Sequence, residues 1–229
     1  MIAAVAVCPH PPLLFRELTG QQDVAADLRA ACLSAIASAT SVDPDVVVAV
    51  GGADSTRSWE AGLPPEVRKF GTTGGRPAAP GAPLSLGVAR RLLDESGWRG
   101  RVELHSIAWD ASPTEVSWLA DQLASRDEVI ALVVLGDGST RRGDKAPGYL
   151  DERAFPFDDA TGRALSVGDV NALMRMDAGL AEELMVGCRA AFAVMATAVR
   201  REGTRPRAKV LYQDDPWGVM YYVALWELA

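Results

Sequence analysis

Histidine and cysteine are scarce in this chain, which has two histidines and three cysteines among 229 residues. Imidazole is the side chain that changes charge near neutral pH, so a histidine mechanism has only His10 and His105 to draw on. The cysteines Cys8, Cys32 and Cys188 are widely spaced and form no Cys-x-x-Cys pair. They therefore predict neither a disulfide framework nor a structural zinc site, and we interpret them as small buried apolar side chains.

Basic residues are fewer than acidic ones, and long apolar runs are absent from the sequence. Lys and Arg total 23 against 30 Asp and Glu, a net charge of −7, and a nucleic-acid surface needs a concentration of basic side chains. The longest apolar runs, residues 46–50 and 130–135, are far shorter than the ~20 residues of a membrane-spanning helix. The first residues lack the basic region of a signal peptide. We expect a cytoplasmic protein without a nucleic-acid or membrane partner.

The remaining composition, 48% hydrophobic and 23% charged, is typical of one globular domain, here taken as 1–229. Apolar periodicity predicts strands and helices in alternation. The expected strands are 2–7, 45–50, 102–107, 130–135, 209–212 and 219–228, and the expected helices are 23–39, 84–96, 115–124 and 167–200. We expect the last helix to break near Gly179 or Gly187, and 63–83 and 141–159 to be irregular. This order predicts a single α/β domain with a central, mostly parallel or mixed sheet flanked by helices on both faces.

Polar turns follow four of the predicted strands. In open α/β sheets, ligands bind beyond the carboxyl ends of the strands. We therefore predict that His10, Asp54, Thr140 and one of Asp214 or Asp215 line one cavity. The turn residues that form this candidate pocket are His10, Asp54, Asp137, Ser139, Thr140, Asp214 and Asp215. Turns of the same kind precede Trp59, Trp109 and Trp217, which are candidate walls of a pocket, although core packing is the default interpretation for each.

Other sites find weaker support in the sequence. There is no Walker lysine and no G-x-G-x-x-G before a helix, so nucleotide binding is poorly supported. There is no G-x-S-x-G and no second histidine at a strand end, which argues against a serine hydrolase. His105 lies inside a predicted strand and is interpreted as structural. For each strand-end acid taken alone, a role as the cap of a helix or a turn is favoured over a functional role.

Three segments together resemble a known family. They are Ala-Val-Cys-Pro-His10-Pro-Pro-Leu-Leu, Val-Val-Leu-Gly-Asp137-Gly-Ser-Thr140-Arg, and Asp214-Asp215-Pro-Trp-Gly-Val-Met-Tyr-Tyr-Val-Ala. They resemble the class III extradiol ring-cleavage dioxygenase superfamily, catalytic B-subunit type, over nearly the whole chain. The resemblance implies a non-haem Fe(II) held by two histidines and a carboxylate, with open positions for a catechol and dioxygen. A further histidine serves as acid and base in that family.

Carried over by position, the resemblance places His10 on the first metal histidine. The second metal histidine falls on Ala53, next to Asp54, and the acid/base histidine falls on Thr140. The carboxylate ligand corresponds to Asp214 or Asp215. Two of the family's three histidines are therefore replaced in this chain.

These replacements imply a diverged member without standard ring cleavage, whose strand-end pocket binds a small molecule or a partner. One alternative is an active metal-dependent oxidoreductase that uses His10, Asp54 and Asp214 as ligands of Fe(II) or another divalent metal. A second alternative is a hydrolase with a strand-end pair of carboxylates, one with a raised pKa. The sequence leaves open the substrate, the metal and whether the chain forms a homo-oligomer.

Overall fold

The computed structural model describes residues 1–19, 22–64 and 81–228. Within them, seven strands form one sheet in the order β3-β4-β2-β5-β1-β7-β6. The strands are β1 (Ile2–Cys8), β2 (Val46–Ala53), β3 (Arg57–Trp59), β4 (Val102–Ala108), β5 (Ile130–Leu135), β6 (Arg207–Asp214) and β7 (Tyr221–Glu227). The four central strands β4, β2, β5 and β1 are parallel, and β3, β7 and β6 are each antiparallel to a neighbour. The sheet is therefore mixed, with a parallel centre.

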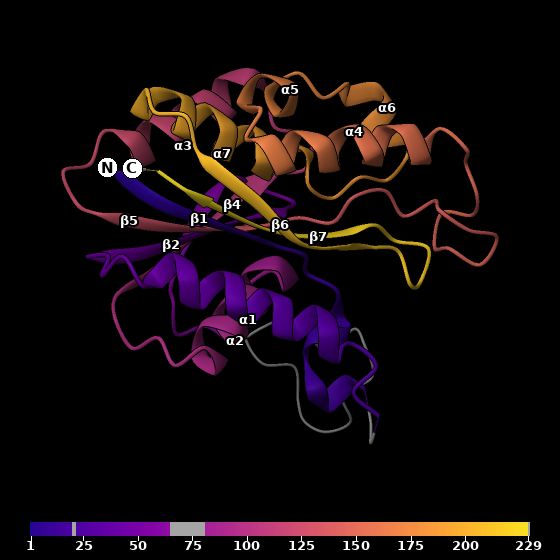
Figure 1. The fold of residues 1–229 in the computed structure, drawn as a ribbon, viewed down its shortest axis with the longest axis horizontal. Helices are drawn as coiled ribbons and strands as arrows, with labels where there is room; N and C mark the ends of the chain where they lie inside the picture. Colours follow the sequence, from indigo (N-terminus) through magenta and orange to yellow (C-terminus); the bar gives the residue numbers. More distant parts are fainter. Residues whose placement is uncertain (20–21, 65–80, 229) are drawn as a thin grey trace.

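Helices cover both faces of the sheet, which confirms the predicted fold class (Figure 1). One face carries α1 (Ala26–Thr40) and α2 (Leu84–Glu95). The opposite face carries α3 (Pro113–Ala124), α4 (Ala154–Val167), α5 (Val170–Met174), α6 (Ala178–Glu183) and α7 (Arg189–Glu202). Two short 3-10 helices, η1 (Pro12–Leu14) and η2 (Arg16–Leu18), follow β1.

The sheet separates two hydrophobic cores, and the side chains of each strand alternate between them. In β1, Val5 and Val7 belong to the core beneath α3 and α7, whereas Ala4 and Ala6 belong to the core above α1 and α2. Successive residues of a strand point to opposite faces, so a strand buried on both faces has a continuous apolar sequence. This double burial explains why the central strands appear in the sequence as uninterrupted apolar runs.

The segment 141–159 is not wholly irregular, contrary to the prediction, because α4 begins at Ala154. The single helix expected over 167–200 is divided among α5, α6 and α7. Gly187 lies in the break before α7, as predicted, whereas Gly179 lies inside α6. The predicted loop 63–83 falls largely on residues 65–80, which lie outside the described residues.

The turn expected after residue 50 is instead the end of a longer strand. Strand β2 continues through Gly51 and Gly52 to Ala53, paired with β4 throughout. A Cβ atom at Gly51 would lie 2.6 Å from Ser85 Oγ, and one at Gly52 would lie 1.9 Å from Trp109 Cζ3. The glycines are therefore required by close packing rather than by a turn.

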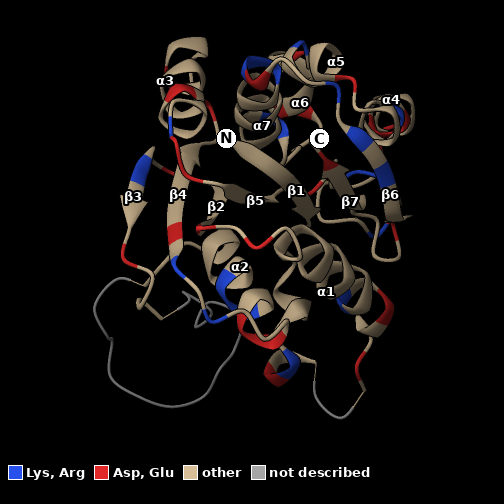
Figure 2. Ribbon diagram, turned by 60° about the vertical axis from the view of Figure 1, so that its left-hand side comes forward, with Lys and Arg blue, Asp and Glu red and all other residues tan. Residues whose placement is uncertain are grey.

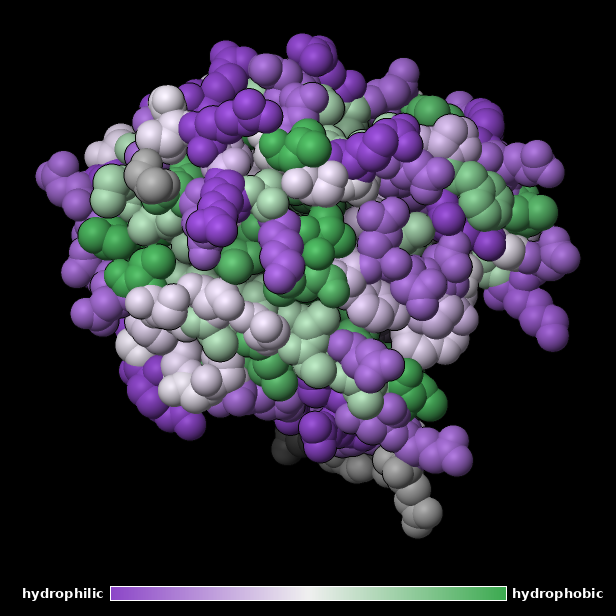
Figure 3. Space-filling view, in the orientation of Figure 1, coloured by the Kyte–Doolittle hydropathy of each residue, from purple (hydrophilic) through white to green (hydrophobic). Residues whose placement is uncertain are grey.

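The cysteines and His105 have the structural roles that the sequence predicted. All three cysteines are buried and free of disulfides, and burial raises the pKa of the Cys32 and Cys188 thiols. His105 lies in β4, with its Nδ1 3.1 Å from Ser58 Oγ, and burial lowers its pKa. No helix in the described ranges is long and apolar enough to cross a membrane. On the face seen in Figure 3, hydrophobic residues form patches at the centre and hydrophilic ones surround them.

Candidate functional site

The strand ends that the sequence singled out lie on one edge of the sheet. The parallel strands β1, β2, β4 and β5 all end there. Strand β6 is antiparallel to β7, which is antiparallel to β1, so β6 also ends at this edge. Three of these strands are followed by His10, Asp54 and Thr140, and Asp214 is the last residue of β6. The four residues therefore lie at the same edge of the sheet, but their side chains are in separate environments.

His10 is held rigidly behind β1. Prolines flank it on both sides, and its backbone N–H donates to Asp137 Oδ1 at 2.8 Å. Its side chain is 10% exposed, and its ring stacks on Trp109 with 6.1 Å between centroids. The buried Nδ1 lies 3.5 Å from Asp137 Oδ1 and has no hydrogen-bond partner among the described residues. Burial raises the pKa of Asp137, and the nearby His10 opposes that rise.

A cavity of about 370 Å³, here called the His10 cavity, opens beside this ring. Its polar side chains come from His10, Asp54, Ser55, Arg57 and Ser85, and its aromatic walls are Trp59 and Trp109.

Hydrogen bonds fix the walls of the His10 cavity. Trp59 Nε1 donates to Ser106 Oγ at 2.8 Å, and the Arg57 guanidinium lies 3.5 Å above the Trp59 ring. Ser85 Oγ donates to the Gly52 carbonyl at 2.8 Å. Trp59 and Trp109, for which core packing was the default interpretation, line this cavity instead.

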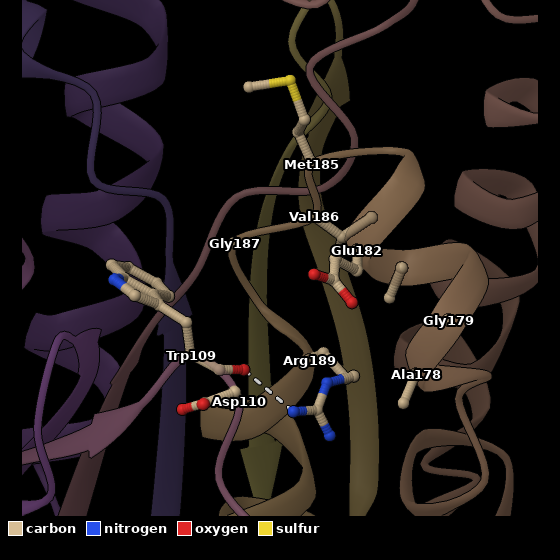
Figure 4. A pocket seen from close by; sticks show the side chains of 10 residues that line it. Trp109, Asp110, Ala178, Gly179, Glu182, Met185, Val186, Gly187 and Arg189 are labelled. Atoms are coloured by element: carbon tan, nitrogen blue, oxygen red, sulfur yellow. Dashed lines mark hydrogen bonds between the residues drawn. The ribbon is translucent and has the colours of Figure 1, made fainter.

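Trp109 also borders a larger cavity of about 550 Å³, which lies between β4 and the segment from α6 to α7 (Figure 4). Arg189 Nη2 donates to the Trp109 carbonyl at 2.8 Å. Gly187 lines this cavity, and a Cβ atom there would lie 3.5 Å from His10 Cε1. In Figure 4, Trp109 lies opposite Ala178 and Gly179, and the Met185 side chain points away from the other side chains. The His10–Trp109 pair thus stands next to both cavities.

Ser139 and Asp215 belong to a polar network that is buried at Ser139 and Asp158 and partly exposed at Asp215. Asp158 on α4 accepts from Ser139 N at 2.9 Å and from Ser139 Oγ. Arg142 lies 3.4 Å from Asp158 and also pairs with Asp215. Burial raises the pKa of Asp158, against the lowering effect of Ser139 and Arg142. The network ties the 137–142 segment to α4.

Asp158 was not identified from the sequence, because its segment looked irregular. Pro156 in the first turn of α4 was the available signal, since proline is tolerated at a helix start.

Thr140 and Asp214 point to other parts of the molecule. Thr140 N donates to the Leu184 carbonyl at 3.2 Å, and the Thr140 hydroxyl is buried with no hydrogen-bond partner in the described chain. Asp214 lines a separate cavity of about 240 Å³ beside the start of α1, together with Tyr212 and Trp217.

The prediction of one shared cavity is therefore corrected. His10 and Asp54 share the His10 cavity. Asp214 and Asp215 lie at the end of β6, which is on the far side of β1 from β2.

The side chains present do not fit an iron held by two histidines and a carboxylate. Ala53, at the position of the second histidine, has no donor atom in its side chain. Across residues 1–19, 22–64 and 81–228, no three His, Cys, Asp or Glu side chains lie close enough to hold one metal ion. The trio His10, Asp54 and Asp214 expected under the metalloenzyme alternative is thus not assembled.

Comparisons with known proteins support the fold alone. No protein-family model and no curated protein matches the chain. Among solved structures, the chain is similar to the crystal structure of uncharacterized protein JW3007 from Escherichia coli K12. The similarity covers 98% of this chain and 99% of that one, with a TM-score of 0.50 and 13% sequence identity. A likeness at this identity defines an α/β fold of the same layout and carries no function with it.

Proposed function

We propose that this chain is a diverged relative of the class III extradiol ring-cleavage dioxygenases that binds a small planar molecule in the His10 cavity without standard ring cleavage. His10 is stacked on Trp109 at the wall of a strand-end cavity, while the positions of the family's other two histidines hold Ala53 and Thr140. The pocket is present, and two imidazoles that the family's chemistry requires are absent.

The lining of the cavity favours an aromatic ring with polar substituents. Trp59 and Trp109 offer flat apolar surfaces. Arg57 and His10 can donate to a hydroxyl or carboxylate oxygen, and Asp54 can accept from a hydroxyl. A volume of about 370 Å³ is near the lower end of the roughly 300–1,000 Å³ range of ligand pockets, which suits a ligand with one ring.

The two alternative functions receive less support from the same side chains. The Thr140 hydroxyl cannot replace imidazole as a proton carrier near neutral pH, which weakens the dioxygenase alternative. A hydrolase would need two adjacent carboxylates that face a cavity. Asp137 and Asp158, whose pKa values are raised, instead accept hydrogen bonds from the His10 backbone and from Ser139.

Titration with catechol and protocatechuate, followed by tryptophan fluorescence and calorimetry, tests the proposal. We expect saturable binding that Trp109→Ala and His10→Ala weaken, and no yellow ring-opened product when Fe(II) and air are supplied. Trp118→Ala is the matched control, because Trp118 on α3 is 54% exposed and lines neither cavity next to His10. Product formed at enzymatic rates and abolished by His10→Ala would overturn the proposal.

A further inference from the structure

A groove of about 330 Å³ between α3 and α7, here called the arginine groove, has only arginine as its charged lining. Arg189, Arg200 and Arg201 line it, and the described lining contains no Asp or Glu. This concentration of positive charge lies on a chain whose net charge is −7. The groove is separate from the His10 cavity and takes no part in the proposed function above.

Helix α7 supplies one wall of the groove along a single stripe. Arg189, Ala193 and Thr197 are spaced four residues apart, and Arg200 and Arg201 follow about one turn later. At 1.5 Å per residue, the backbone positions of Arg189 and Arg200 are about 16 Å apart. Helix α3 lies beside α7 on the same face of the sheet and supplies the opposite wall (Figure 2).

Two of the three arginines bond to neutral atoms. Arg189 Nη2 donates to the Trp109 carbonyl at 2.8 Å, and Arg200 Nη1 contacts Met174 Sδ at 3.8 Å. Arg201, in contrast, pairs with Asp121 and donates to the Ser117 carbonyl at 3.0 Å and hydroxyl at 2.8 Å. Arg201 is therefore held in place and its charge is balanced by Asp121. Arg189 and Arg200 form no ion pair within the described residues.

Helix stability accounts for only part of this pattern. Arginines in the last turn interact favourably with the negative end of the helix dipole, which suits Arg200 and Arg201. Arg189 is the first residue of α7, where the positive end of the helix dipole disfavours a cation. The helix dipole therefore does not explain an arginine at position 189.

We propose that the arginine groove binds an organic anion that has a phosphate or carboxylate head and an apolar body. The head lies between Arg200 and the hydroxyls of Thr197 and Ser117, because a guanidinium and hydroxyls are matched donors for such oxygens. The body lies along Val116 and Ala193 towards Arg189. Arg189 adds attraction from the far end of the groove.

Calorimetric titration of the intact protein with phenyl phosphate at low salt tests this site. We expect saturable binding that is tighter than that of inorganic phosphate and that weakens as salt is added. Arg200→Gln should weaken it about tenfold, as loss of a charged hydrogen bond does. Arg207→Gln is the matched control, because it removes the same charge from a side chain on β6 that is 90% exposed, and we expect no change.

Ala193→Phe is a second variant that fills the groove without changing its charge, and it should abolish phenyl phosphate binding. Thermal unfolding of each variant confirms that it is folded. His10→Ala should leave phenyl phosphate binding unchanged, which separates this site from the His10 cavity.

Equal weakening by Arg200→Gln and Arg207→Gln, or wild-type binding by Ala193→Phe, would overturn the proposal. So would binding to anionic phosphatidylglycerol vesicles with none to phenyl phosphate, because the ligand would then be a membrane surface.

Discussion

Gly52 allows Trp109 to lie against the end of β2, next to His10. A Cβ atom at position 52 would lie 1.9 Å from Trp109 Cζ3, so any side chain there must displace the indole. We expect Gly52→Ala to cost about 1–3 kcal/mol of unfolding free energy, as overpacking does, and to weaken aromatic binding in the His10 cavity. Urea denaturation and fluorescence titration measure the two effects. Gly62→Ala is the control, since nothing lies within 4 Å of a Cβ atom there, and equal behaviour of the two variants would contradict this account.

Asp158 gives a second test at the scale of single residues. Its carboxylate is fully buried and accepts two hydrogen bonds from Ser139, with Arg142 beside it. Asp158→Ala leaves these donors unpaired, and we expect a loss of about 3–5 kcal/mol in unfolding free energy. Asp159→Ala changes the neighbouring exposed residue and should have little effect. Similar denaturation midpoints for both variants would show that the network does not stabilise the 137–142 segment.

At the scale of elements, the buried central strands were each located from the sequence, although β2 continues past residue 50 to Ala53. The run 130–135 has the same bounds as β5, because every residue of that strand is buried. Helix α4 was missed because its buried side chains include Asp158 and Thr161, so its inner face lacks an apolar stripe. Strand β3 is three residues long and pairs only at the sheet edge, and so short a segment shows no periodicity.

Glu103 on strand β4 belongs to a charged cluster whose contribution to the free energy of unfolding depends on pH. Arg126 and Arg101 hold the pKa of Glu103 at about 2, below its ordinary 4.5. The ionised Glu103 carboxylate therefore stabilises the folded protein fully above pH 4.5, and this stabilisation is lost as the pH falls towards 2. We expect Glu103→Gln to cost up to about 1 kcal/mol at pH 7, because the cluster is partly exposed, and nothing near pH 2. Chemical denaturation of wild type and variant at several pH values checks this, and a difference independent of pH would refute it.

At the scale of the whole molecule, the sequence located strand ends but not their order across the sheet. His10, Asp54 and Trp109 could be placed near a common pocket because β1, β2 and β4 are parallel and end together. The position of Asp214 relative to them depends on β7 and β6 lying beyond β1, away from β2. No local sequence pattern encodes the order of the strands. The prediction of one common cavity was therefore wrong.

We infer that this fold has a strand-end pocket without a metal centre of two histidines and one carboxylate. Anaerobic calorimetric titration of the wild-type protein, His10→Ala and Asp54→Ala with Fe(II) and with Zn(II) tests it most directly. One imidazole with scattered oxygen donors should hold these ions weakly, so we predict no tight site in any of the three proteins. A single tight Fe(II) or Zn(II) site in the wild type that is lost in both variants would contradict the account and favour a metalloenzyme.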